Sequence, residues 1–458
     1  MAQRAARFRL RVSATRRVSD DRVPLREVLR LAAPALPVLA AEPLYLLVDT
    51  AVVGRLGVVP LAGLAIAGVL FAQVTSQLNF LSYGTTARAA RLHGAGRRTE
   101  AVAEGGQATW LALAVGLVLL AVGQLVAVPV AGAFAGDGEI ADAAVSWLRV
   151  ALFGAPLILV TLAGNGWMRG VQDTVRPLRY VLAGNGLSAV LCPVLVHGVG
   201  WGLPGSAAAN VTGQALGAGL FLLALRRERG FARPDLATMR AQLVLGRDLI
   251  ARSLAFQACF LSAAAVAARF GAASVAAHQI VLQLWFFMAL VLDAVAIAAQ
   301  SLVGAALGSG AVARARALAG QVTRYGLVLG VGFGVLFAAL IGVLPPVFTG
   351  DAAVLALVPV AWWFFVAMQP IAGVVFALDG VLLGAGDAAF LRTSTLAAAV
   401  LGFLPLIWAS LVFGWGLAGI WTGLSLFMVA RLVAVGLRTR SGRWLVTGAV
   451  RPSGSPQR

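Results

Sequence analysis

The sequence of 458 residues contains no lysine, so its 36 basic residues are all arginines. A Walker A motif needs a lysine that reaches phosphate, and Schiff-base chemistry needs a lysine amine. We therefore do not expect this chain to use ATP itself or to form an imine. Only two cysteines occur, Cys192 and Cys259, and both lie inside apolar runs. This argues against a disulfide framework and against a cysteine zinc site, and no metal is expected.

Charged residues are also scarce. They make up 12% of the chain, whereas hydrophobic residues make up 60%. Soluble proteins carry about 25% charged residues, so the composition predicts a polytopic membrane protein. At about 20 residues for each span, the apolar runs accommodate about twelve helices. The predicted fold class is therefore an all-α membrane protein.

The net charge of +18 reflects membrane topology in our interpretation, not a nucleic-acid partner. Arginines cluster on alternate connections between the spans, while the other connections carry mainly acidic residues such as Asp137, Glu139 and Asp351. By the positive-inside rule, both termini are expected in the cytoplasm of a multi-pass protein of the cell (inner) membrane. An even number of spans agrees with that topology.

The second half of the chain repeats the first at a shift of 214 residues. Gly94, Gly170 and Asp173 fall on Gly308, Gly384 and Asp387, and GWGL at 200–203 falls on GWGL at 414–417. Each half holds six spans, so the repeats are parallel and related by a pseudo-two-fold axis along the membrane normal. Such pairs of bundles serve alternating access.

These observations divide the chain into five parts. We expect a basic cytoplasmic arm at residues 1–27, an N-lobe at 28–225, a cytoplasmic linker at 226–247, a C-lobe at 248–437 and a cytoplasmic tail at 438–458. The arm holds eight arginines and would at most touch anionic lipid.

Four acids lie well within apolar runs: Glu42, Asp49, Asp293 and Asp379. An ionised aspartate at the centre of a membrane helix costs roughly 2.5–3.5 kcal/mol, so each is a functional candidate. Under the shift of 214, Glu42 and Asp49 fall on Phe256 and Ala263, which carry no charge. This asymmetry is expected if one lobe binds a coupling ion. Arginines within the spans are interpreted as snorkelling from span ends: Arg149, Arg252, Arg324 and Arg431.

The spans of the N-lobe also carry polar side chains at Asn165, Asn185, Ser188 and Asn210. Taken singly, each is more often a hydrogen bond between helices than a ligand contact. As a set, together with Asp293 and Asp379, they are the candidate substrate-binding residues.

Several segments resemble the MATE (multidrug and toxic compound extrusion) family, in its DinF-like branch. They include EPLYLLVDTAVVGRLG at 42–57, MRGVQDTVRPL at 168–178, LDAVAIAAQSLVGAALGSG at 292–310 and ALDGVLLGAGD at 377–387. The resemblance implies a twelve-helix, two-lobed exporter that exchanges organic cations or amphiphiles for protons or sodium. It also implies that Asp49 is the ion-coupling aspartate of the first helix.

One stretch departs from the family pattern. Members often place a second carboxylate in the fifth helix, where this chain has Cys192, and Ser188 replaces an asparagine. Asp49 is therefore expected to act alone or with Glu42. With few hard oxygen ligands, we favour protons over sodium as the coupling ion.

The function predicted from the sequence is a secondary antiporter that exports organic cations, drugs or amphiphilic metabolites. It is expected to be a monomer without a cofactor, driven by a proton or sodium gradient. The alternative within the superfamily is a flippase for lipid-linked precursors, which would want an arginine-lined cavity for phosphate. A membrane enzyme or structural subunit is a third alternative, but no catalytic constellation such as H-E-x-x-H occurs.

Overall fold

The computed structural model describes residues 24–136 and 138–449, so most of the predicted arm at 1–27 and the end of the tail lie outside the described residues. The described residues form helices joined by short turns, without strands. Twelve of the helical segments are long and apolar enough to cross a membrane. This confirms the predicted all-α fold with twelve spans.

The first six spans are built from eight helices. They are α2 (Leu25–Val53), α3 (Val58–Gln77), α4 (Phe80–Gly94), α5 (Arg98–Ala135), α6 (Glu139–Ala151), α7 (Ala155–Gly170), α8 (Val175–Pro193) and α9 (Gly202–Arg227). The second and fourth spans are each divided into two helices, and a π-helical turn, Val194–Gly198, extends α8.

The last six spans are built from seven helices, and a short eighth helix, α13 (Leu344–Phe348), lies between two of the spans. The seven are α10 (Leu236–Arg269), α11 (Ala272–Gly308), α12 (Val312–Leu340), α14 (Ala352–Gly384), α15 (Ala388–Ala397), α16 (Leu404–Val412) and α17 (Gly416–Arg440). A π-helical segment, Ala398–Phe403, joins α15 to α16 within one span.

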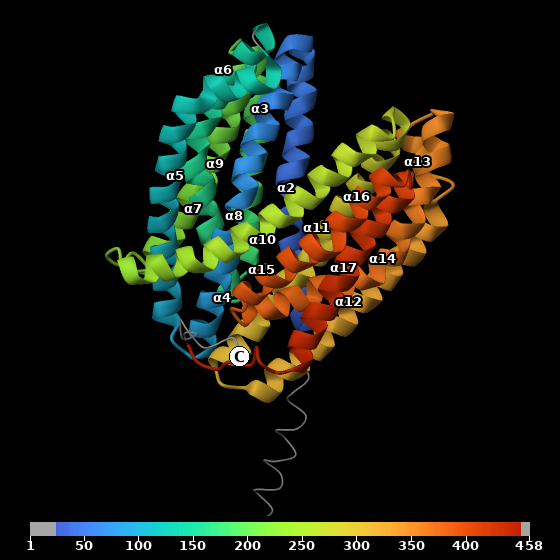
Figure 1. The fold of residues 1–458 in the computed structure, drawn as a ribbon. Helices are drawn as coiled ribbons and strands as arrows, with labels where there is room; N and C mark the ends of the chain where they lie inside the picture. The colour runs from blue at the N-terminus through green and yellow to red at the C-terminus, as the bar shows by residue number, and fades with distance from the viewer. Residues whose placement is uncertain (1–23, 137, 450–458) are drawn as a thin grey trace, which may run out of the picture.

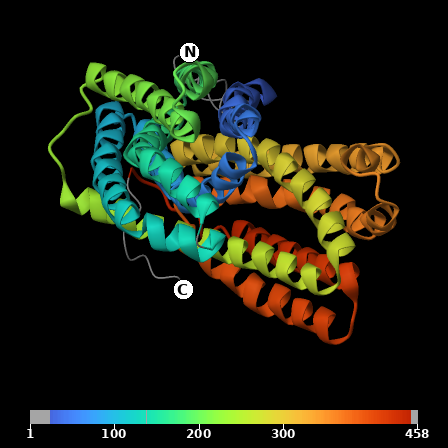
Figure 2. The same cartoon turned by 90° about the horizontal axis from the view of Figure 1, so that it is seen from above.

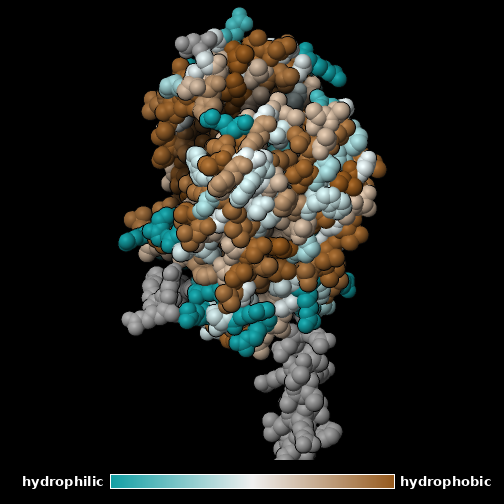
Figure 3. Space-filling model, turned by 45° about the vertical axis from the view of Figure 1, so that its right-hand side comes forward, coloured by the Kyte–Doolittle hydropathy of each residue, from teal (hydrophilic) through white to brown (hydrophobic). Residues whose placement is uncertain are grey.

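The helices gather into two lobes. Figure 2 shows the helices of the first half on one side and α11 to α17 on the other. The lobes diverge toward the upper end of Figure 1, and both the start of α2 and the end of α17 lie at the lower end. Hydrophobic side chains cover much of the visible surface, and many of the hydrophilic ones lie toward the lower end (Figure 3). This distribution fits a protein surrounded by lipid.

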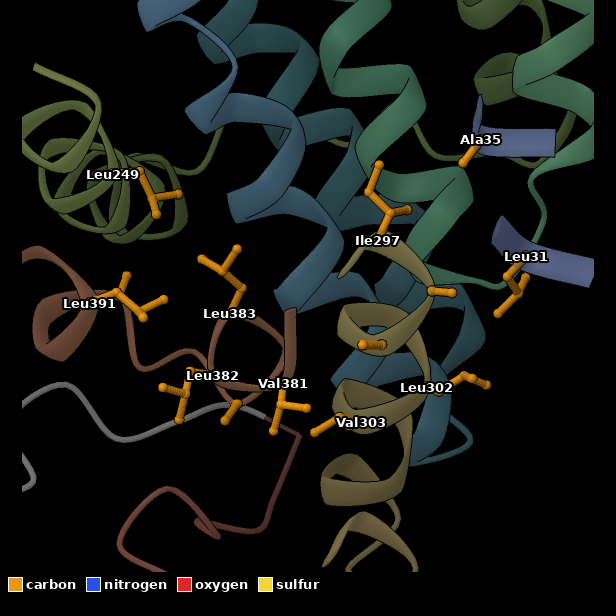
Figure 4. Close-up of a cluster of buried hydrophobic side chains, with 14 of the residues drawn as sticks. Leu31, Ala35, Leu249, Ile297, Leu302, Val303, Val381, Leu382, Leu383 and Leu391 are labelled. Atoms are coloured by element: carbon orange, nitrogen blue, oxygen red, sulfur yellow. The ribbon is translucent and has the colours of Figure 1, made fainter. Parts of the chain in front are cut away.

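A buried apolar cluster joins the two lobes. Leu31 and Ala35 of α2 belong to the same cluster as Ile297 and Leu302 of α11. Figure 4 shows these side chains together with leucines and valines of α14 and α15. Helices far apart in the chain therefore share one core where the lobes meet.

The backbone keeps the register of the predicted repeat. Gly96 and Gly310 both have a φ of 75°, and Gly200 and Gly414 have φ of 79° and 67°. These positive φ values suit glycine because it lacks a Cβ. At the lobe interface, Gly94 packs on the backbone of Ala305, and Gly308 packs on the backbone of Arg91. Since 308 minus 94 and 305 minus 91 are both 214, the two contacts are pseudo-symmetric copies of each other.

The long helix α10 connects the lobes. It runs diagonally across Figure 1 and contacts α4 and α5 on one side and α15 and α17 on the other. It begins at Leu236, so residues 236–247, which we expected in the linker, are helical. The loop before α10 is fixed to α5 because Gln107 Nε2 donates to Arg233 O at 2.9 Å.

Candidate functional site

Asp49 lies in α2, in the apolar interior of the N-lobe. Its side chain is 1% exposed, and Oδ1 accepts a hydrogen bond of 2.5 Å from Ser206 Oγ. The thiol of Cys192 donates to the same oxygen at 3.4 Å. No ion pair joins Asp49 to an arginine in the described part of the chain. The carboxylate is therefore held by neutral donors alone.

Three helices bring this group together. Asp49 is in α2, Cys192 is at the end of α8, and Ser206 is in the first turns of α9. The close approach of α9 to the π-helical turn after α8 depends on Gly205, since a Cβ there would come within 3.0 Å of the Leu195 backbone. Cys192 occupies the position where the family pattern has a second carboxylate. The structure thus places that position in direct contact with Asp49.

Glu42, the second coupling candidate, lies on the same helix as Asp49 but has an exposed side chain. Among the described residues, no hydrogen bond or ion pair joins the two carboxylates. Their spacing of seven residues puts them about two helical turns apart. A joint role for Glu42 remains a prediction.

The candidate substrate residues separate into two groups. Asn165, Ser188 and Asn210 are buried in the N-lobe, and Asn185 Nδ2 donates to Val181 O of its own helix at 3.1 Å. None of these four lines the cavity that Asp293 and Asp379 face. Their assignment as substrate ligands stays a prediction.

The second site is a cavity of about 300 Å³ in the C-lobe. Asp379 of α14 forms ion pairs through Oδ2 with Arg252 of α10 and Arg431 of α17. Asp293 of α11 accepts a hydrogen bond of 2.7 Å from the hydroxyl of Tyr83, which belongs to α4 of the N-lobe. The cavity is therefore closed partly by the other lobe.

The prediction that Arg252 and Arg431 snorkel from span ends is wrong. Arg431 is 1% exposed, and both side chains face the cavity. The physical reason is helix length, because α10 begins at Leu236 and α17 ends at Arg440. Arg252 is therefore sixteen residues inside its helix, and Arg431 is nine residues from the end of its own. Each guanidinium is stabilised by Asp379 instead of by water.

Sequence reasoning also missed Ser206 and Tyr83. Ser206 lies 157 residues from Asp49 in the chain, and Tyr83 lies 210 residues from Asp293. The repeat gives no signal for these two residues, but it does mark the acids of the second site. At the shift of 214, Asp379 falls on Asn165 and Asp293 falls on Asn79. A carboxylate in one lobe and an amide in the other mark positions where the two lobes diverged chemically.

Two pseudo-symmetric lobes of six spans, with buried polar groups in each, are typical of membrane transporters. A family model described as MatE matches residues 34–194 and 249–408, one segment in each lobe. The chain belongs to the MATE family, whose members are multidrug and toxic-compound efflux transporters. It is therefore a transporter and not an enzyme.

Individual relatives agree with this assignment. Protein DETOXIFICATION 44, chloroplastic, from Arabidopsis thaliana is 35% identical over 440 residues, which cover 91% of this chain and 83% of the relative. DNA damage-inducible protein F from Escherichia coli (strain K12) is 29% identical over 433 residues, or 90% and 92% of the two chains. A crystal structure of MATE in the bent conformation has a TM-score of 0.84 at 20% identity, with 92% and 95% covered. That likeness shows the same fold.

Proposed function

We propose that this protein is a secondary antiporter that exports organic cations, drugs or amphiphilic metabolites in exchange for protons. Asp49 is the coupling residue in this proposal. The observation that carries it is the contrast between Asp49, held by two neutral donors, and Asp379, held by two arginines. A buried carboxylate without a cation beside it can take up and release a proton, whereas an ion-paired one is stabilised in its charged form.

The proposed topology places both termini in the cytoplasm. It is supported by the arginines on alternate connections and by the common end at which α2 starts and α17 finishes (Figure 1). In this orientation, the end where Gly94 and Gly308 join the lobes faces the cytoplasm. The described conformation is then closed toward the cytoplasm. We also propose a monomer in contact with membrane lipids and without a cofactor.

The experiment uses everted membrane vesicles. Acidification of the vesicle interior should drive uptake of a fluorescent organic cation, and Asp49→Asn should reduce the rate to background because its side chain cannot carry the proton. Asp142→Asn is the matched control, since it removes an exposed carboxylate from the first turn of α6. Equal amounts of each variant in the membrane must be verified.

Two outcomes would change the proposal. Full transport by Asp49→Asn would remove the coupling role of this residue. A sodium requirement at fixed pH would replace the proton with sodium.

A flippase for lipid-linked precursors is the second candidate. A flippase would want an arginine-lined cavity for phosphate, and Arg252 and Arg431 line the C-lobe cavity. Guanidinium groups are common ligands of phosphate. This observation keeps the flippase as an alternative, which the lipid competitors described below would support.

A further inference from the structure

The C-lobe cavity combines aromatic walls with buried charge. Its volume of about 300 Å³ is at the lower end of the range for small-molecule sites. Phe256, Trp285, Trp421 and Phe427 supply flat apolar surfaces, and Arg252, Arg431, Asp293 and Asp379 supply the charges. A cavity of this kind suits a compact molecule with an apolar body and one polar end.

Hydrogen-bond donors outnumber acceptors on its polar side. Each guanidinium carries five N–H donors. Arg252 and Arg431 each direct Nη2 to Asp379 Oδ2, and Arg431 Nη1 lies 3.9 Å from the sulfur of Met428. The Nε atoms of both arginines are buried without a partner among the described residues, as is Asp379 Oδ1. These Nε groups are enclosed by protein atoms, so an anionic group in the cavity would accept hydrogen bonds from the Nη groups of the two arginines.

The charges point to the same kind of ligand. The cavity itself holds two arginines and two aspartates. The buried Arg169 acts on Asp293 from outside the cavity and adds a third positive charge. In and directly around the cavity, three positive charges therefore act on two carboxylates, and a bound monoanion would balance the excess. An organic cation would instead enter beside Arg252 and Arg431, whose charges repel it.

The guanidinium groups are held in place before any ligand arrives. The Arg431 guanidinium lies 4.6 Å from the centre of the Phe256 ring, and that of Arg252 lies 5.4 Å from the same ring. Cation–π contacts and the shared Asp379 therefore fix both groups around one aromatic side chain. This reduces the entropy that binding would otherwise cost.

We propose that this cavity binds an amphipathic organic monoanion. The carboxylate or phosphate of the ligand accepts hydrogen bonds from Arg252 and Arg431, and its apolar body lies among Trp285, Trp421 and Phe427. This inference rests on the proposed export function, and it assigns the C-lobe cavity to the amphiphilic metabolites named there and not to the organic cations. The same chemistry could reach the cavity from water or from the lipid bilayer.

The test measures equilibrium binding to the purified full-length protein in a non-ionic detergent. Three probes share one apolar body and differ in head group: 1-pyrenebutyrate, 1-pyrenebutanol and 1-pyrenebutylammonium. Binding is followed by energy transfer to pyrene from tryptophan, since Trp285 and Trp421 line the cavity. Trp421→Phe should weaken the transfer signal and so locate the probe.

The carboxylate should bind about tenfold or more tightly than the alcohol, as charge-assisted hydrogen bonds predict, and the ammonium should bind most weakly. Arg252→Gln should lower the affinity for the carboxylate about tenfold and leave that for the alcohol unchanged. The Arg431–Asp379 pair remains in this variant, which protects the fold. Arg247→Gln is the matched control on the same helix, because that side chain is 68% exposed and lies outside the cavity.

Ammonium binding as tight as carboxylate binding would overturn the proposal, and so would an unchanged carboxylate affinity in Arg252→Gln. Competition by 2-naphthoate identifies an aqueous anion, whereas competition by oleate or phosphatidate identifies a lipid. If 2-naphthoate, oleate and phosphatidate all failed to compete, this would also contradict the proposed anion-binding site. Binding in detergent needs no ion gradient, so a negative binding result does not affect the transport test of Asp49. Likewise, a negative result in the transport test does not affect the binding proposal.

Discussion

Asp49 and Asp379 are both buried carboxylates in apolar helices, but the donors around them differ in charge. Asp49 accepts from a hydroxyl and a thiol, whereas Asp379 pairs with two guanidinium groups. Neutral donors stabilise a carboxylate less than cations do, so the two aspartates suit different tasks. In the proposed cycle, Asp49 exchanges a proton while Asp379 keeps the arginines of the C-lobe cavity in position.

The contact between Cys192 and Asp49 leads to a prediction about ion choice. Cys192→Asp would place a second carboxylate within reach of Asp49 and near the Ser206 hydroxyl, which together offer hard oxygen ligands for a cation. We expect sodium to raise the thermal stability of this variant and to have no such effect on the wild type. The measurement is a thermal unfolding series in sodium against choline at constant ionic strength.

Cys192→Ser is the control for that experiment. It keeps a donor to Asp49 but adds no charge, so sodium should not stabilise it. Equal sodium responses in Cys192→Asp and Cys192→Ser would show that the two side chains do not form a cation site.

The sequence alone identified Asp49 because an acid inside an apolar run stands out by its insertion cost. It did not identify Ser206, since a serine in a membrane helix is inexpensive and its partner is 157 residues away. The arginines of the C-lobe cavity were misjudged for a related reason. Their role depends on where α10 begins and on Asp379 of a distant helix, neither of which follows from local hydropathy.

At the scale of elements, α10 is longer than the hydrocarbon core of a membrane is thick. Its 34 residues span about 51 Å, whereas the hydrocarbon core of a bilayer is about 30 Å thick. Residues 236–247 fall in the predicted linker because hydropathy records the environment of a segment and not its backbone conformation. The helix begins where Asp235 caps it, by accepting from the backbone N–H groups of Ala237 and Thr238.

This cap predicts a pH-dependent contribution to stability. Hydrogen bonds from Thr238 and Ala237 lower the pKa of Asp235 below its ordinary value of 3.8. A carboxyl with a lowered pKa stabilises the folded state at pH values above 3.8, and the contribution is lost as the pH falls through its folded value. Asp235→Ala should therefore lower the unfolding temperature at pH 7 and pH 5, with a difference that shrinks as the pH approaches 3.

Asp235→Asn distinguishes the cap from the charge. Asparagine caps helices about as well as aspartate but does not titrate in this range, so its unfolding temperature should stay above that of Asp235→Ala at every pH tested. The three unfolding curves can be recorded by tryptophan fluorescence in detergent. A pH-independent difference between the wild type and Asp235→Ala would contradict the titrating cap.

For the whole molecule, the repeat predicted two lobes and the register between them, because glycines and tryptophans recur at one fixed shift. It did not predict which conformation the lobes adopt. One sequence encodes every state of an alternating-access cycle, and the free-energy differences between states depend on contacts across the lobe interface. Gly94 and Gly308 make such contacts, each against the backbone of the opposite lobe.

Gly308→Val should therefore favour the conformation that is open at the end where Gly94 and Gly308 join the lobes. A Cβ at position 308 would lie 2.8 Å from Arg91 Cα, closer than real Cβ atoms approach, so α4 and α11 must separate. Overpacking typically costs about 1–3 kcal/mol, which would change the ratio of the two conformations roughly 5- to 150-fold. Spin labels at positions 98 and 314, where the arginines are 58% and 45% exposed, can report the separation of the lobes.

The distance distribution between these labels should shift to longer values in Gly308→Val, in a protein whose Cys192 and Cys259 are replaced by serine. Gly308→Ala should give a smaller shift in the same direction, because its side chain intrudes less. Gly320→Val is the matched control, since no atom lies within 4 Å of a Cβ built at that glycine of α12. If Gly308→Val and Gly320→Val gave the same distribution as the unsubstituted protein, the glycine contacts would not set the balance between the two conformations.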